Sequence, residues 1–259
     1  MNFVKVFRES LSYLRKIKTY IYLAAGLFLF GAIIGFFSSS QLGFLDELLK
    51  NLAKQAEGLN TREIIWFIFQ NNLKSAFFTM ILGVFLGIFP VINALTNGVL
   101  LGYVFSRVSA IDGWVSLWKI FPHGIFELPA VFIAMGLGMS MGFGFINNYF
   151  RRYKKDRVMK TLGIISLISA FIGLTLIISP LNAKAFDILY NILIVLFGIF
   201  LTAPFVLLFF LNDKKLGLIQ RKSISEKFYS SLKVFFYAVL PLLVIAAIIE
   251  GLLIAYYAT

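Results

Sequence analysis

Long apolar segments without charge constrain the fold of this chain more than any other feature of its sequence. The 18 residues from Tyr20 to Phe37 contain no Asp, Glu, Lys or Arg, and further strongly apolar segments follow. A transmembrane helix needs about 20 mostly apolar residues to cross ~30 Å of hydrocarbon. Charged residues make up only 14% of the chain, against about 25% in soluble domains. The sequence therefore predicts an all-α fold, a polytopic transmembrane helical bundle.

We expect about seven spans within a single transmembrane domain at 20–259. Pro90 is expected to end the second span, and the sequence leaves open whether 64–72 belongs to that span. The third span is the least apolar, because Asn93 and Asn97 lie near its start. The expected spans are 20–37, 73–90, 91–109, 123–146, 161–180, 188–211 and 234–258.

Two other segments have the apolar spacing of amphipathic helices that lie on a membrane surface. The first, at 1–19, also carries five Lys and Arg residues, and it precedes the first span. The second follows that span, so it is expected on the opposite side of the membrane. The apolar faces comprise Phe3, Phe7, Leu11 and Leu14 in the first segment, and Leu45, Leu48, Leu49 and Leu52 in the second.

The distribution of basic residues predicts the orientation. With the N-terminus inside, the inner segments 1–19, 147–160 and 212–233 hold five, six and six cations, which is 17 of the 24 Lys and Arg. Inner loops of membrane proteins carry such an excess of Lys and Arg. With seven spans, the sequence predicts an N-in, C-out protein of the plasma membrane.

The net charge of +12 does not indicate a nucleic-acid-binding protein, because the basic residues lie in short segments between apolar runs rather than on one soluble face. We expect the lipid bilayer and other membrane proteins as partners, a homo-oligomer as an option, and no nucleic acid. The chain has no cysteine, which excludes a disulfide framework, a thiolate metal site and a cysteine nucleophile.

Pairs of glycines four residues apart occur in three of the expected spans. Glycines at this spacing share a helical face and let two backbones approach closely in lipid. We expect them to mediate helix packing within the monomer, with the seam of a homodimer as the alternative. The pairs are Gly83 with Gly87, Gly98 with Gly102, and Gly138 with Gly142.

Two acidic residues, Glu127 and Glu250, fall inside expected spans, where an ionisable group is costly and is by default a functional candidate. His123, the only histidine, lies one helical turn before Glu127 on the same face. In the predicted topology all three lie in the outer part of the membrane, where Asn72 can join them. We therefore predict a functional polar cluster of His123, Glu127, Glu250 and Asn72. Further polar positions in the spans are Asn71, Asn93 and Asn97.

Three interpretations of this cluster remain open: a structural hydrogen-bonded cluster, a site that binds a proton or cation, and a catalytic metal site. A metal ion, if there is one, would be held by His123, Glu127 and Glu250. Zinc catalysis usually takes three protein ligands, often several histidines, and the chain has one His, no Cys and no H-E-x-x-H motif. A serine hydrolase is disfavoured because no G-x-S-x-G motif occurs. We therefore expect no cofactor, and enzyme activity is not the favoured interpretation.

The segment Pro122-His123-Gly124-Ile125-Phe126-Glu127-Leu128-Pro129-Ala130 resembles the P-H-G-x-x-E-x-x-A signature of the stage II sporulation protein M family of integral membrane proteins. Two other stretches agree with this family in order and spacing. One extends from Asn71 to Gly102, and the other is Ala246-Ala247-Ile248-Ile249-Glu250, which resembles the closing helix of the family. The expected spans at 161–180 and 188–211 look like two transmembrane helices added to a shorter core.

The resemblance implies a polytopic scaffold or assembly protein of the plasma membrane, with the polar cluster between the fourth and seventh spans. The competing function is a transporter or channel that moves a proton, a cation or a small solute through that cluster. A third alternative is an intramembrane metal-dependent hydrolase.

Overall fold

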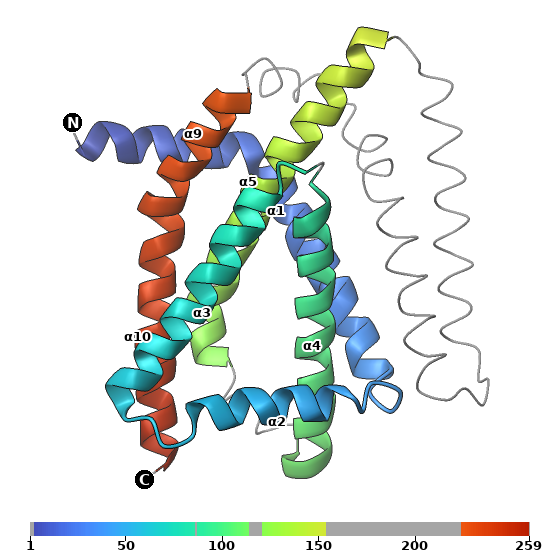
Figure 1. Ribbon diagram of the computed structural model, residues 1–259, viewed down its shortest axis with the longest axis vertical. Helices are drawn as coiled ribbons and strands as arrows, with labels where there is room; N and C mark the ends of the chain where they lie inside the picture. Colours follow the sequence, from blue (N-terminus) through green and yellow to red (C-terminus); the bar gives the residue numbers. More distant parts are fainter. Residues whose placement is uncertain (1–2, 86, 114–120, 154–223, 259) are drawn as a thin grey trace.

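The computed structural model describes residues 3–85, 87–113, 121–153 and 224–258, and every regular element in these ranges is helical (Figure 1). The all-α prediction is confirmed for this part of the chain. The expected spans at 161–180 and 188–211 lie outside the described residues. The elements are α1 (Phe3–Phe37), α2 (Leu45–Ala56), α3 (Thr61–Leu82), α4 (Ile88–Asp112), α5 (Phe121–Tyr153), α9 (Ile224–Val234), the π-helix η3 (Phe235–Val239) and α10 (Leu240–Ala258).

Four of the described helices are long and apolar enough to cross a membrane, so the protein is a transmembrane helical bundle. α3 has 22 residues but is not one of the four, and it carries Arg62, Glu63 and Lys74. The four candidate spans are Val4–Phe37, Ile88–Ile111, Gly124–Gly144 and Ser225–Tyr256.

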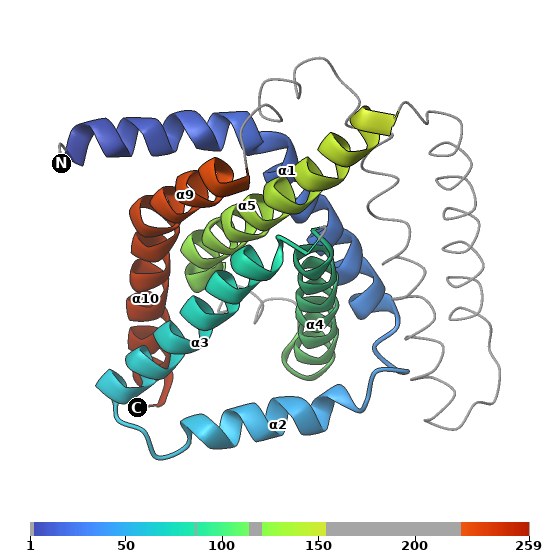
Figure 2. The ribbon, with the colours of Figure 1, turned by 45° about the horizontal axis from the view of Figure 1, so that its top comes forward.

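The two segments with amphipathic spacing lie across opposite ends of the bundle. Figures 1 and 2 show the N-terminal part of α1 across one end, together with α9, and α2 across the other end. The remaining helices run between these two ends. This arrangement agrees with surface helices on opposite sides of a membrane.

α1 is one continuous helix from Phe3 to Phe37, whereas the sequence suggested separate elements at 1–19 and 20–37. The reason is a single buried stripe that continues through the expected boundary. Because its members recur every three or four positions, one unbroken helix buries all of them. The buried residues are Val6, Ser10, Tyr13, Ile17, Tyr20, Ala24 and Phe28.

α3 begins at Thr61, 12 residues before the expected second span, so 64–72 belongs to this helix. A capping box starts it: the Asn60 side chain accepts hydrogen bonds from the backbone of Arg62 and Glu63, and Glu63 accepts one from the backbone of Asn60. α3 ends at Leu82 rather than at Pro90, so the boundary expected at 73–90 is incorrect for the helix.

Pro90 lies in the first turn of α4, where its missing N–H costs no helical hydrogen bond. The reversal between the two helices occurs at Gly87, whose φ of 72° is in the left-handed region. An L-residue with a side chain is strained there, whereas glycine is not. The α3–α4 connection therefore depends on this glycine, and not on Pro90.

α1 and α4 pack backbone to backbone through reciprocal glycines. A Cβ atom at Gly98 or Gly102 would overlap the backbone of α1, at Phe28 and Ala32 respectively. A Cβ at Gly31 or Gly35 of α1 would in turn overlap the backbone of α4. The expectation that Gly98 and Gly102 mediate packing within the monomer is therefore confirmed.

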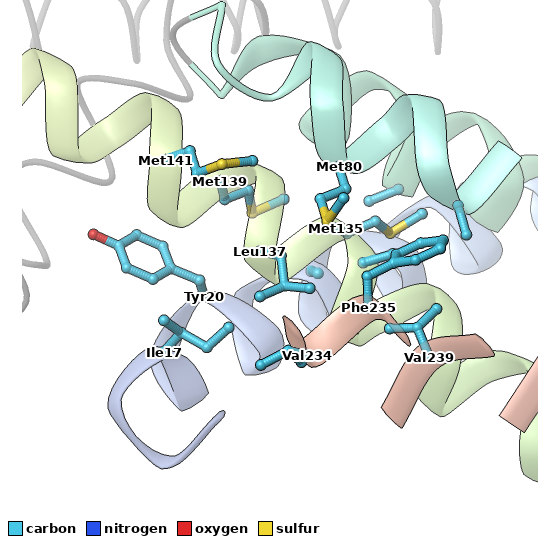
Figure 3. Close-up of a cluster of buried hydrophobic side chains, with 14 of the residues drawn as sticks. Ile17, Tyr20, Met80, Met135, Leu137, Met139, Met141, Val234, Phe235 and Val239 are labelled. Atoms are coloured by element: carbon cyan, nitrogen blue, oxygen red, sulfur yellow. The ribbon is translucent and has the colours of Figure 1, made fainter. Parts of the chain in front are cut away.

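α3 and α5 make a similar contact at Gly83 and Gly138, where an added Cβ at Gly83 would overlap the backbone of Gly138. Around it lies an apolar core to which α1, α3, α5 and η3 contribute (Figure 3). In this core Met80 of α3, Met135 of α5 and Phe235 of η3 lie together. These tight contacts fix the relative positions of the helices that carry the candidate site.

Candidate functional site

Glu127 of α5 and Glu250 of α10 are near each other although 123 positions separate them in the sequence. Both side chains are half-buried, and the charge of Glu127 acts electrostatically on Glu250. α10 packs against both α5 and α3. Among the described residues neither carboxylate forms an ion pair or a hydrogen bond. The structure thus brings two acidic groups together without a described cation to balance them.

The end of α10 that carries Glu250 lies against the beginning of α3. A Cβ at Gly251 would overlap the Ile65 side chain, and at the other end of the helix pair the Phe77 and Phe235 rings are 5.4 Å apart. These two contacts show that α3 and α10 run antiparallel. They also place Glu250 beside the first turns of α3.

Asn72 lies seven residues beyond Ile65 on α3, about 10 Å along the helix from the contact with Gly251. Its side chain is half-buried, whereas that of the neighbouring Asn71 is exposed. Within the described ranges no hydrogen bond joins either asparagine to Glu127 or Glu250. The place of Asn72 in the polar cluster therefore stays a prediction.

His123 lies in the first turn of α5, one turn before Glu127, and its side chain is outside the described part of the structure. Pro129, inside the same helix, has no N–H to donate, so the carbonyl of Ile125 loses its helical partner next to Glu127. In the described residues no group of three or more His, Cys, Asp or Glu side chains could hold a metal ion.

Of the other two predicted polar positions, Asn93 connects two helices and Asn97 bonds within its own helix. The Asn93 amide donates a 2.7 Å hydrogen bond to the hydroxyl of Thr79, which joins α4 to α3. The Asn97 amide donates to the backbone carbonyl of Asn93 at 2.9 Å, within α4. Both amides thus satisfy polar groups inside helices, as expected for polar residues within spans.

A polar clamp that sequence reasoning missed holds α2 against α4. The Tyr103 hydroxyl donates a 2.6 Å hydrogen bond to Asp46, and Arg107 forms a 2.7 Å ion pair with the same carboxylate. The hydrogen bond from Tyr103, with the charge of Arg107, holds the pKa of Asp46 below its usual value. Arg107 also donates to the Tyr103 oxygen at 3.0 Å. No local sequence signal predicts this clamp, because Asp46 is about 60 residues from both partners.

A second polar group that was not predicted lies at the opposite end of the bundle. Lys227 of α9 is only 2% exposed, and its ammonium lies directly over Gly144 of α5. Ser140 and Ser231 are also fully buried between these helices. A lysine in an otherwise basic loop gives no sign of burial, so only the tertiary structure reveals it.

Comparison with known proteins finds a relative that matches part of the chain. The chain is 31% identical over 108 residues to an uncharacterized protein of the archaeon Methanocaldococcus jannaschii. The aligned region covers 39% of this chain and 47% of the relative, so the chain spans about half the length of that curated relative. No solved structure matches the chain.

A match to a family model assigns the chain to a protein family. The model of the family described as Stage II sporulation protein M matches residues 24–181. The matched region includes His123 and Glu127, whereas Glu250 lies beyond its end. Since the match covers more than half of the sequence, the chain belongs to the stage II sporulation protein M family.

Proposed function

We propose that this protein is a scaffold or assembly protein of the plasma membrane, in which the Glu127–Glu250 pair fixes the arrangement of α5 and α10. The observation that carries this proposal is the direct backbone packing of α1 on α4 and of α3 on α5, at glycines that leave no space for a Cβ atom. Helices packed in this way cannot slide or rotate without breaking many contacts. A rigid frame of this kind suits a protein that holds partners in position.

The acidic pair fits this role if the two carboxyl groups share a proton. Two carboxylates close together in a region of low dielectric cannot both ionise without a large cost, and a shared proton converts their repulsion into a hydrogen bond. Such a bond would connect helices from the two ends of the chain. The partners in this proposal are other membrane proteins or further copies of the chain.

The second candidate is a transporter or channel for a proton or cation. The observation that favours it is that Glu127 and Glu250 lie in candidate spans with no ion-pair partner among the described residues. Intramembrane carboxylates often mark ion pathways. A transporter, however, must alternate between two arrangements of its helices around the site.

Spin-label distance measurements separate the two candidates. Ile125 and Ile248 are exposed and lie two residues before Glu127 and Glu250, and the chain has no native cysteine. The Ile125→Cys/Ile248→Cys variant therefore carries two labels, one on α5 and one on α10. In proteoliposomes a scaffold gives a single distance that is the same at pH 5.5 and pH 8, with or without an ion gradient.

Flux assays on the same proteoliposomes complete the test. For a scaffold we expect proton, sodium and potassium fluxes no higher than in protein-free liposomes. Flux well above that background, lost in both Glu127→Gln and Glu250→Gln, together with a second label distance, would establish the transporter instead.

A further inference from the structure

A cavity of about 310 Å³ is lined by residues of the N-terminal part of α1 and of α9. Figure 1 shows these two segments at the end of the bundle opposite α2. This volume is at the lower end of the range for small-molecule sites. Ser10 and Tyr13, both more than 90% buried, form its inner wall. The cavity is separate from the acidic pair, and the proposed scaffold role does not use it. Its charged and aromatic lining consists of Glu9, Tyr13 and Lys16 from α1 and Glu226, Tyr229 and Lys233 from α9.

The charges of the lining are of both signs, and one pair is already formed. Lys233 makes a 2.8 Å ion pair with Glu9, and its ammonium lies 4.7 Å from the centre of the Tyr229 ring. Lys16, by contrast, makes no ion pair with any described residue. Glu226 contributes a carboxylate from the opposite helix. The lining therefore includes a cation on α1 and a carboxylate on α9.

The position of the cavity points to a lipid as the ligand. In the N-terminal part of α1, Val4, Phe7 and Leu11 are exposed apolar side chains on one face, whereas Lys5 and Arg8 lie on another. A helix with this pattern lies in the membrane surface, with its polar face at the level of the headgroups. A cavity beside that polar face opens where phospholipid headgroups are concentrated.

We propose that this cavity binds the phosphoethanolamine headgroup of a membrane phospholipid, with its phosphate against Lys16 and its ammonium against Glu226. A phosphate oxygen forms charge-assisted hydrogen bonds with a lysine, and a primary ammonium donates up to three hydrogen bonds to a carboxylate and nearby hydroxyls. Tyr13 and the serine hydroxyls of both helices provide further polar contacts for the headgroup.

The same chemistry selects against the other common headgroups. A glycerol headgroup keeps the negative phosphate but has no cation to place against Glu226, so this carboxylate would repel it. A choline headgroup has the positive charge, but its methyl groups replace the N–H donors that a carboxylate binds. Of these three headgroups, only ethanolamine provides both a positive charge and N–H donors at the position of Glu226.

The test uses the full-length chain purified in detergent and titrated with short-chain phosphatidylethanolamine, phosphatidylglycerol and phosphatidylcholine, with binding measured by native mass spectrometry. We expect phosphatidylethanolamine to bind at least fivefold more tightly than the other two. Lys16→Gln should weaken its binding about tenfold, as for the loss of one charge-assisted hydrogen bond. Lys18→Gln is the matched control: Lys18 is exposed on the same helix but does not line the cavity, and binding should be unchanged.

Glu226→Gln tests recognition of the amine separately, and it should remove the preference for ethanolamine over choline. A cooperative thermal unfolding transition shows that this variant is still folded. Equal binding of all three lipids by the parent protein would overturn the assignment of the headgroup. Binding of phosphatidylethanolamine that is unchanged in both Lys16→Gln and Glu226→Gln would overturn the site. Soluble glycerophosphoethanolamine should compete only weakly, because it lacks the acyl chains. If it binds as tightly as the lipid, the ligand is a soluble phosphate ester and the lipid proposal is wrong.

Discussion

The hydroxyl of Tyr103 donates a 2.6 Å hydrogen bond to the carboxylate of Asp46, which ties α2 to the body of the bundle through α4. Arg107 supports the same carboxylate with a 2.7 Å ion pair. Leu48 and Leu52 of α2, and Phe44 just before it, are exposed rather than packed on the bundle. The clamp is therefore the main polar attachment of this helix among the described residues.

Replacing Asp46 should detach α2 without unfolding the bundle. In Asp46→Asn the ion pair with Arg107 is lost, and we expect amide hydrogen exchange in Leu45–Ala56 to accelerate about two- to fivefold, as for an exposed ion pair. Glu47→Gln is the control: Glu47 follows Asp46 and is exposed, and its substitution should leave the exchange in α2 unchanged. Exchange in α4 and α5 should not respond to either substitution. Equal protection of α2 in Asp46→Asn and the parent would contradict the role of the clamp.

The stabilisation that this clamp gives to α2 should be lost at low pH. The pKa of Asp46 is lowered in the folded protein from an ordinary value of 3.8, so the clamp contributes its full stabilisation above that value. The contribution is lost as pH falls below 3.8 and through the lower pKa of the folded state. We expect exchange in α2 to be constant from pH 7 to pH 5 after correction for intrinsic rates. Any accelerated exchange specific to the parent should begin only below about pH 4.

The helix packing predicts a clear contrast between two glycines. Gly83→Ala places a methyl group against the backbone of Gly138, and we expect a loss of about 1–3 kcal/mol in the free energy of unfolding. At Gly26 nothing lies within 4 Å of an added Cβ, so Gly26→Ala should be neutral, or stabilising by up to about 1 kcal/mol. Thermal unfolding in detergent measures both variants. A loss of similar size at both positions would show that α3 and α5 are not in direct backbone contact.

The sequence predicts those structural features that depend on neighbouring residues, and it misses those that depend on distant ones. Uncharged segments such as Tyr20 to Phe37 predict membrane helices because span length and hydropathy are local properties. The family was also predictable, since the segment from Pro122 to Ala130 carries its signature, and the family match includes this segment. The sequence predicted only one side of the contact between α1 and α4. Gly98 and Gly102 were identified as packing residues, but Gly31 and Gly35 on α1 were not.

The errors at helix ends have a different cause. Hydropathy placed the second span at 73–90, which shares only 73–82 with α3. It missed the beginning of α3, which the capping box of Asn60 and Glu63 sets in a polar segment. That N-x-x-E pattern is visible in the sequence and could have corrected the boundary. The burial of Lys227 and the pairing of Asp46 with Tyr103 have no such pattern, because they depend on how distant helices meet.

The site of Lys227 provides a second steric test. In Gly144→Ala the new methyl group occupies the space of the lysine ammonium, so either Lys227 or α5 must move. Because the ammonium is the far end of a flexible side chain, we expect a loss of about 1 kcal/mol in the free energy of unfolding, at the low end for added volume in a packed site. Lys227→Ala in the same chain makes room for the methyl group, so the double variant should lose less than the sum of the two single losses. Strict additivity in this double-mutant cycle would contradict the contact.

The Glu127–Glu250 pair should tolerate amide substitutions. When the two carboxyl groups share a proton, the amide N–H of Glu127→Gln or Glu250→Gln can replace that proton as the donor to the remaining carboxylate, so each single variant should be nearly neutral in thermal unfolding near pH 7. Marked destabilisation by both single variants would instead indicate a bound cation that needs the two charges.

Metal analysis tests the remaining interpretation of the acidic pair. For a scaffold in which the two carboxyl groups share a proton, we expect less than about 0.1 metal ion per chain by elemental analysis of detergent-purified protein, because a catalytic zinc site usually has three protein ligands. The described residues provide two acidic groups here, and His123 is the one further candidate within a turn of Glu127. The metal content of the parent is compared with that of His123→Ala and Glu250→Ala. Glu57→Ala is the control, because Glu57 is exposed and lies away from the site. Near-stoichiometric zinc in the parent and the control, lost in both site variants, would replace the shared proton with a metal ion. It would also make an intramembrane hydrolase the function to assay.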